Sequence, residues 1–119
     1  MEALLEKYRE HLGTLNFAKG TIKGHALSLN RFLAYLRDNN ITDIAAVTKE
    51  TIRDYQTYLF EEINASGMPN SVFHQNNRLK AVKAFFRFLH ENDYIVGNPA
   101  KEIPYAKTPQ RLPRSILTQ

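Results

Sequence analysis

The segment from about residue 71 to residue 91 constrains the fold most, because its apolar residues follow a helical period over a wide face. At 100° per residue, apolar side chains cover about half of the helix circumference: Leu79, Ala81, Val82, Phe85, Phe86, Phe88 and Leu89. We therefore expect a central, mostly buried helix, capped by Asn70 or Ser71. A narrow polar stripe remains, and its charged members are all basic: Asn76, Lys80, Lys83, Arg87 and His90.

Three further helices are predicted, and no two-residue alternation indicates a strand. The first covers about residues 2–12 and ends at Gly13. The second covers about residues 19–38 and closes at Asn39 and Asn40. The third runs from the N-cap Thr48 to about residue 63, before a turn-rich loop at residues 64–70. The fold class is therefore all-α, with four helices.

The C-terminal end has a different composition from the helical part. Four of the five prolines fall in the last 21 residues: Pro99, Pro104, Pro109 and Pro113. Proline favours an extended tether over a helix. With 119 residues, the chain has room for one domain. We therefore expect a domain over residues 1–100 and a linker over residues 101–119 that is cut short.

Composition and motifs exclude several classes of protein. The chain has no cysteine, so disulfides, thiolate metal sites and a cysteine nucleophile are excluded. The charged N-terminus offers no apolar run for a signal peptide or a spanning helix, which favours a cytoplasmic protein without membrane contact. A P-loop, GxGxxG, HExxH and any acid–base cluster are missing. We expect no catalytic residue, no metal and no cofactor.

The charges along the chain form three blocks. Residues 11–37 and residues 63–90 each carry four Lys or Arg residues and no acidic residue. Residues 38–62 between them hold six acidic residues against two basic ones. Two basic windows around an acidic one favour a bipartite surface that binds an anion.

The beginnings of the second and fourth predicted helices supply the candidate contacts. A helix N-terminus attracts phosphate, Asn, Gln and Arg side chains can contact base edges, and Lys and Arg can follow the backbone. Duplex DNA is the predicted ligand, and the candidate residues are Lys19, Thr21, Lys23, His74, Gln75, Asn76, Asn77, Arg78, Lys80, Lys83 and Arg87.

Two other functions remain open at this point. The basic face could dock an acidic protein partner, which would make the chain a protein–protein interaction module. A small enzyme with an unrecognised site is the third possibility. His25 lies on the apolar side of the second predicted helix, so we interpret it as a structural residue.

The order and spacing of three segments resemble the N-terminal core-binding, SAM-like domain of tyrosine recombinases, which include phage integrases and Xer-type enzymes. The segments are Thr21-Ile22 with residues 31–36 (RFLAYL), residues 76–89 (NNRLKAVKAFFRFL) and residues 95–100 (IVGNPA). Residues 111–118 are similar to the linker that enters the catalytic domain. Two positions depart from the family: Ala18 replaces a frequent Ser, which removes a helix cap or phosphate contact, and His25 replaces a frequent Tyr, which loosens packing.

The resemblance implies a function for the whole surface. The domain would form half of a clamp around a recombination half-site, with the second and fourth helices on the duplex and Arg111 and Arg114 of the linker completing the contacts. Implied partners are duplex DNA, the chain's own C-terminal catalytic domain and other recombinase protomers, in a nucleoid-associated complex. The family's catalytic residues lie beyond the linker, and no histidine of this chain has the family's arginine three residues later.

Overall fold

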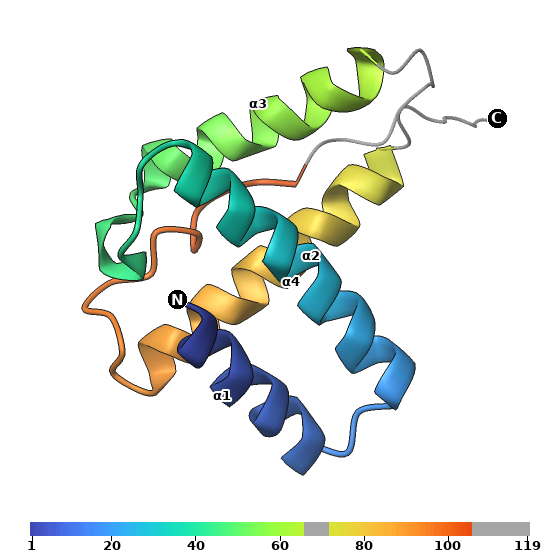
Figure 1. Cartoon of the computed structure of the whole chain (residues 1–119), viewed down its shortest axis with the longest axis vertical. Helices are drawn as coiled ribbons and strands as arrows, with labels where there is room; N and C mark the ends of the chain where they lie inside the picture. The colour runs from blue at the N-terminus through green and yellow to red at the C-terminus, as the bar shows by residue number, and fades with distance from the viewer. Residues whose placement is uncertain (66–71, 106–119) are drawn as a thin grey trace, which may run out of the picture.

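The helix Val72–Glu91 (α4) lies at the centre of the computed structural model, in contact with the other three α-helices (Figure 1). The structure describes residues 1–65 and 72–105, without the side chains of residues 62–65 and 72–74. Leu79, Val82, Phe85, Phe86 and Leu89 of α4 are all essentially inaccessible to solvent. The prediction of a central, buried helix is confirmed.

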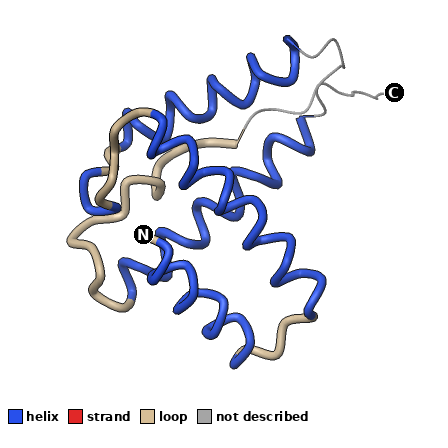
Figure 2. The backbone as a smooth tube through the Cα atoms, viewed as in Figure 1, coloured by secondary structure: helices blue, strands red, loops and turns tan. Residues whose placement is uncertain are grey.

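Helices and loops make up the whole described part of the chain (Figure 2). The order is α1 (Glu2–Thr14), α2 (Lys19–Asp38), a short 3₁₀ turn (Ile44–Ala46), α3 (Lys49–Ala65) and α4. α1 and α2 pack side by side, α2 crosses α4, and α3 covers another side of α4. The all-α, four-helix prediction is confirmed.

Three of the helices end in the same backbone motif. Asn16, Asn40 and Asp93 adopt the left-handed conformation just after α1, α2 and α4, with φ of 64°, 63° and 62°. In each case the next amide bonds back to a helix carbonyl five residues earlier, as Ile41 N–H does to Leu36 C=O at 2.8 Å. Asn and Asp tolerate this conformation better than other non-glycine residues. Asn39 and Asn40 thus close α2 as predicted.

The predicted end of α1 is wrong by two residues. Gly13 does not stop this helix but lies within it, since α1 continues to Thr14 with Leu15 as its C-cap. The residue with left-handed backbone is Asn16, which takes the position after the helix that glycine often occupies. The turn therefore leaves Leu15 and Phe17 exposed on the connection to α2.

The starts of α2 and α3 differ in how they are capped. Thr48 caps α3, because its Oγ1 accepts a hydrogen bond from Thr51 N–H at 3.2 Å and the Thr48 N–H donates to Thr51 Oγ1. Ala18 occupies the N-cap of α2, where no side chain caps the helix. The amide groups at the beginning of α2 consequently have no side-chain cap, as the departure at Ala18 predicts.

The chain beyond α4 returns to the helices and packs on them. Ala100 and Ile103 are fully buried in the same core as α4. Gln56 of α3 donates to Pro104 C=O at 3.1 Å, and Lys49 of α3 pairs with Glu102 at 3.0 Å. We call residues 98–105 the exit segment. It extends the packed unit past residue 100, where the linker is predicted to begin, and residues 106–119 of that linker lie outside the described residues.

Replacing Ile103 with Ala should therefore destabilise the whole domain. The substitution removes a buried side chain and leaves a cavity, which lowers the free energy of unfolding by about 2–5 kcal/mol. Urea unfolding followed by circular dichroism measures the loss. Val96→Ala is the control, because Val96 is fully exposed, and should change stability by less than about 0.5 kcal/mol. Equal values for the two variants would contradict the packing of the exit segment.

Candidate nucleic-acid interface

The polar stripe of α4 carries three cations at spacings of three and four residues. Lys80 and Arg87 are exposed, and Lys83 between them is partly buried. Arg87 donates from Nε to Glu91 at 3.2 Å on the same helix, and both side chains are mainly exposed. An exposed pair of this kind is worth little, so Arg87 can leave Glu91 for another anion at low cost.

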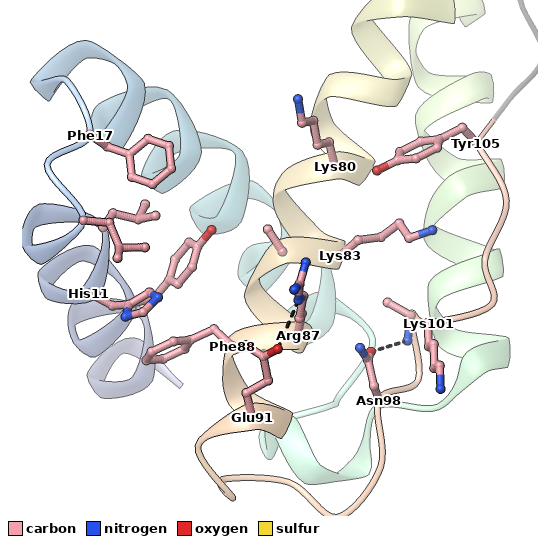
Figure 3. Close-up of a pocket in the computed structure, with 15 residues that line it drawn as sticks. His11, Phe17, Lys80, Lys83, Arg87, Phe88, Glu91, Asn98, Lys101 and Tyr105 are labelled. Carbon is pink, nitrogen blue, oxygen red and sulfur yellow. Dashed lines mark hydrogen bonds and ion pairs between the residues drawn. The ribbon is translucent and has the colours of Figure 1, made fainter.

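A groove of about 590 Å³ runs along this stripe. Figure 3 shows α1 and the α1–α2 connection on one side of it, α4 in the middle and the exit segment on the other side. The groove is lined by Tyr8, His11, Leu12, Leu15, Phe17, Lys80, Lys83, Ala84, Arg87, Phe88, Glu91, Asn98, Ala100, Lys101 and Tyr105. Four of these are Lys or Arg and one is acidic, so the groove favours an anionic ligand.

The wall of the groove opposite the cations is apolar and partly aromatic. Leu15 and Phe17 are 56% and 46% exposed. His11 packs against Phe88 with ring centroids 4.8 Å apart. The groove thus offers cations to phosphates and an apolar surface to sugar or base edges.

Lys83 differs from its neighbours because its ammonium group is bound within the protein. Its Nζ donates to Ile103 C=O at 2.6 Å and lies 4.7 Å from the centroid of the Tyr105 ring. Figure 3 shows the side chain turned toward the exit segment. Lys83 is therefore less accessible to a ligand in the groove than Lys80 or Arg87.

The predicted polar run at the start of α4 is not a single surface. Asn77 is exposed, Asn76 and Arg78 are partly buried, and Gln75 is only 6% exposed. Gln75 faces the core, and the structure removes it from the set of surface contacts predicted from sequence. Asn76 lies one turn before Lys80 and continues the basic stripe. The side chain of His74 lies outside the described residues.

The candidates on α2 form a separate region. Lys19, Thr21 and Lys23 are exposed, and none of them is among the residues that line the groove in the described part of the chain. Lys19 and Lys23 share one side of α2, while Thr21 points about 200° away. Arg37, further along the side of Lys23, pairs with Glu2 of α1.

Sequence reasoning missed the contribution of the connections to this site. Leu15, Phe17, Lys101 and Tyr105 line the groove although they lie in turns or beyond the helices. In the sequence, Lys101 is only one more charge of the tail. The helical period carries no information about where connections return, so their positions were not predictable. Arg111 and Arg114 lie outside the described residues.

His25 contacts Tyr8, one of the residues that line the groove. Its Nδ1 lies 3.4 Å from the Tyr8 hydroxyl. Burial, together with the nearby charge of Lys80, lowers the pKa of His25. Burial raises the pKa of Tyr8. A neutral imidazole beside a protonated phenol fits the structural role that we predicted for His25.

Two further classes of site are absent from the described part of the chain. No group of three or more His, Cys, Asp or Glu side chains there could hold a metal ion. Within the same residues, no helix has the length and apolar character needed to cross a membrane.

Comparison with known proteins shows which family the chain belongs to. The family model described as "Phage integrase, N-terminal SAM-like domain" matches residues 4–95. The chain is 30% identical over 114 residues to tyrosine recombinase XerC 2 of Ralstonia nicotianae. The aligned region covers 96% of this chain and 33% of that protein. It is 26% identical to tyrosine recombinase XerC of Oceanobacillus iheyensis, over 95% of this chain and 35% of the relative. The chain thus spans about a third of the length of these relatives.

A solved structure has the same fold. The N-terminal domain of a phage integrase/site-specific recombinase from Haloarcula marismortui superposes with a TM-score of 0.71 over 87% of this chain and 92% of the other. The two sequences are 18% identical, so the likeness concerns the fold. Together with the family match, it confirms the resemblance inferred from sequence.

The pKa of His25 should report the charge of Lys80. In a Lys80→Met variant, the pKa of His25 should rise, because one of its two lowering causes is removed. It should stay below the ordinary value of about 6.5, because burial remains the larger cause. Titration of the His25 ring protons by NMR measures this. Lys101→Met also removes a cation from the groove and should leave the pKa of His25 unchanged; equal shifts would contradict the assignment.

Proposed function

Because the chain belongs to the family of phage integrase N-terminal SAM-like domains, we propose that it is a duplex-DNA-binding module of a tyrosine site-specific recombinase. The groove along α4 carries the proposal, since it joins Lys80, Arg87 and Lys101 from two separate parts of the chain. The names of the relatives, tyrosine recombinases, support the same assignment. The proposed ligand is a recombination half-site.

Phosphate contacts supply most of the proposed affinity. Lys80, Arg87 and Lys101 are exposed and line the same groove. Cations in this arrangement displace counterions from the DNA backbone, which makes binding strongly dependent on salt. Lys19 and Lys23 form a second proposed contact region at the start of α2, where amide groups without a side-chain cap favour an anion. Thr21 lies on another side of the helix, so its proposed contact is separate from theirs.

Base recognition is proposed for the start of α4. Asn77 is exposed three residues before Lys80, the first cation of the basic stripe, and Asn76 continues that stripe. An asparagine amide can donate to and accept from the edge of an adenine in the major groove. We assign sequence preference to these two residues and orientation on the duplex to the cations.

The remaining partners belong to the same proposal. A catalytic domain of the same protein would close the other half of the clamp, with Arg111 and Arg114 as contacts on the way to it. Other protomers would occupy the neighbouring half-site. Docking of an acidic protein on the basic groove is the second candidate, because the same charges would attract carboxylates.

Binding to duplex DNA should weaken steeply as salt rises. Single substitutions Lys80→Ala, Arg87→Ala and Lys101→Ala should each weaken binding and lower the slope of log K against log salt by about one. Fluorescence anisotropy with labelled duplex at about 50 and 200 mM salt measures the binding constant at each concentration and thus the slope. Arg53→Ala is the control, because Arg53 is exposed on α3 and does not line the groove.

A slope near zero, or no binding at low salt, would contradict the DNA proposal. Competition with poly-glutamate at matched charge distinguishes the second candidate, docking of an acidic protein, from the binding of duplex DNA. If it displaces the duplex completely at equal charge concentration, the groove is a general acidic-partner site.

Asn77→Ala should change which sequences are bound more than how tightly DNA is bound. Selection from a randomised duplex pool should give a consensus with at least one relaxed position, because one bidentate base contact is worth about 1–3 kcal/mol. Lys80→Ala serves as the comparison and should weaken all sequences alike while keeping the consensus. An unchanged consensus in the Asn77 variant would show that this side chain does not contact a base.

A further inference from the structure

We propose that Lys83 is a positioning residue that holds the exit segment on the helical domain and so sets the path along which the chain leaves it. This role goes beyond DNA binding and replaces the phosphate contact expected for Lys83 from sequence. It depends only on contacts within the chain, so it holds whether or not the groove binds DNA.

The partners of Lys83 carry the first step. The Nζ–Ile103 C=O distance of 2.6 Å is that of a short, charge-assisted hydrogen bond. The Tyr105 ring, with its centroid 4.7 Å away, adds a cation–π contact. Lys83 thus binds the exit segment at two residues, one on each side of Pro104.

The surroundings of these contacts show that the exit segment is held along its whole length. Asn98 Oδ1 accepts from Ala100 N–H at 3.0 Å, which forms a turn at its beginning. The Ile103 side chain is fully buried beneath the carbonyl that Lys83 binds. α3 holds the other edge through Gln56 to Pro104 C=O and Lys49 to Glu102. Lys49 lowers the pKa of Glu102 through this pair.

The choice of partners leaves the charge of Lys83 intact. A carbonyl and an aromatic ring bind the ammonium group without cancelling its charge, whereas Arg87 is paired with a carboxylate. Lys83 therefore still adds to the positive potential of the groove that it lines. One residue orients the exit segment and contributes to the field without touching the ligand.

Hydrogen exchange of the exit-segment amides tests this role directly. Lys101 and Ile103 donate their amides to Asn98 C=O and Ala100 C=O, so their exchange reports whether the segment stays in place. Lys83→Met should speed exchange of these amides about tenfold, since a hydrogen bond to a charged group is lost. Tyr105→Leu should speed it less, and it leaves the charge in place.

Lys80→Met is the matched control, because it removes a cation one turn away on the same stripe. It should leave exchange of the exit segment unchanged, and amides of the α2 core should exchange alike in all variants. Equal exchange in the Lys83 and Lys80 variants would overturn the proposal. So would a Lys83→Met variant with unchanged exchange and a salt slope reduced by about one, which would identify a phosphate contact.

The two proposals fail separately. If none of the proteins binds duplex DNA while Lys83→Met alone releases the exit segment, the proposed function is lost and the positioning role of Lys83 stands. If DNA binds and Lys83→Met leaves the exit segment protected, the positioning role is lost and the proposed function stands.

Discussion

The burial of the wide apolar face of α4 is the constraint on which the rest of the structure depends. Its apolar face packs against α1, α2 and α3, while the polar stripe, Asn77 and Glu91 stay at the surface. The same packing thus forms the core and displays the cations. A change that repacked α4 would move Lys80 and Arg87 together, because both are fixed to the helix that the core holds.

The groove lies along α4, between α1 with the α1–α2 connection on one side and the exit segment on the other. The α1–α2 connection supplies exposed Leu15 and Phe17, and the exit segment supplies Lys101 and Tyr105. Cations on one wall and apolar side chains on the other suit a ligand that is charged along its backbone and less polar between its charges. DNA has this character, and the membership of the chain in a recombinase domain family agrees with it.

The exit segment belongs to both the core and the groove. Its buried side chains, Ala100 and Ile103, pack in the core, while Lys101 and Tyr105 face the groove. The core and the groove therefore share one structural element. Lys83 lies at their meeting point and is bound to neutral partners, so it can serve the path of the chain without weakening the potential of the groove.

The sequence by itself determined the four helices, the central place of α4 and the basic stripe, because helical period and charge are local properties. It also predicted the Thr48 cap and the Asn39-Asn40 ending of α2. Only the tertiary structure decided that Lys83 binds the exit segment and that the lysines of α2 lie apart from the groove. These outcomes depend on the angles at which helices cross and on where connections return, and residues distant in sequence set both.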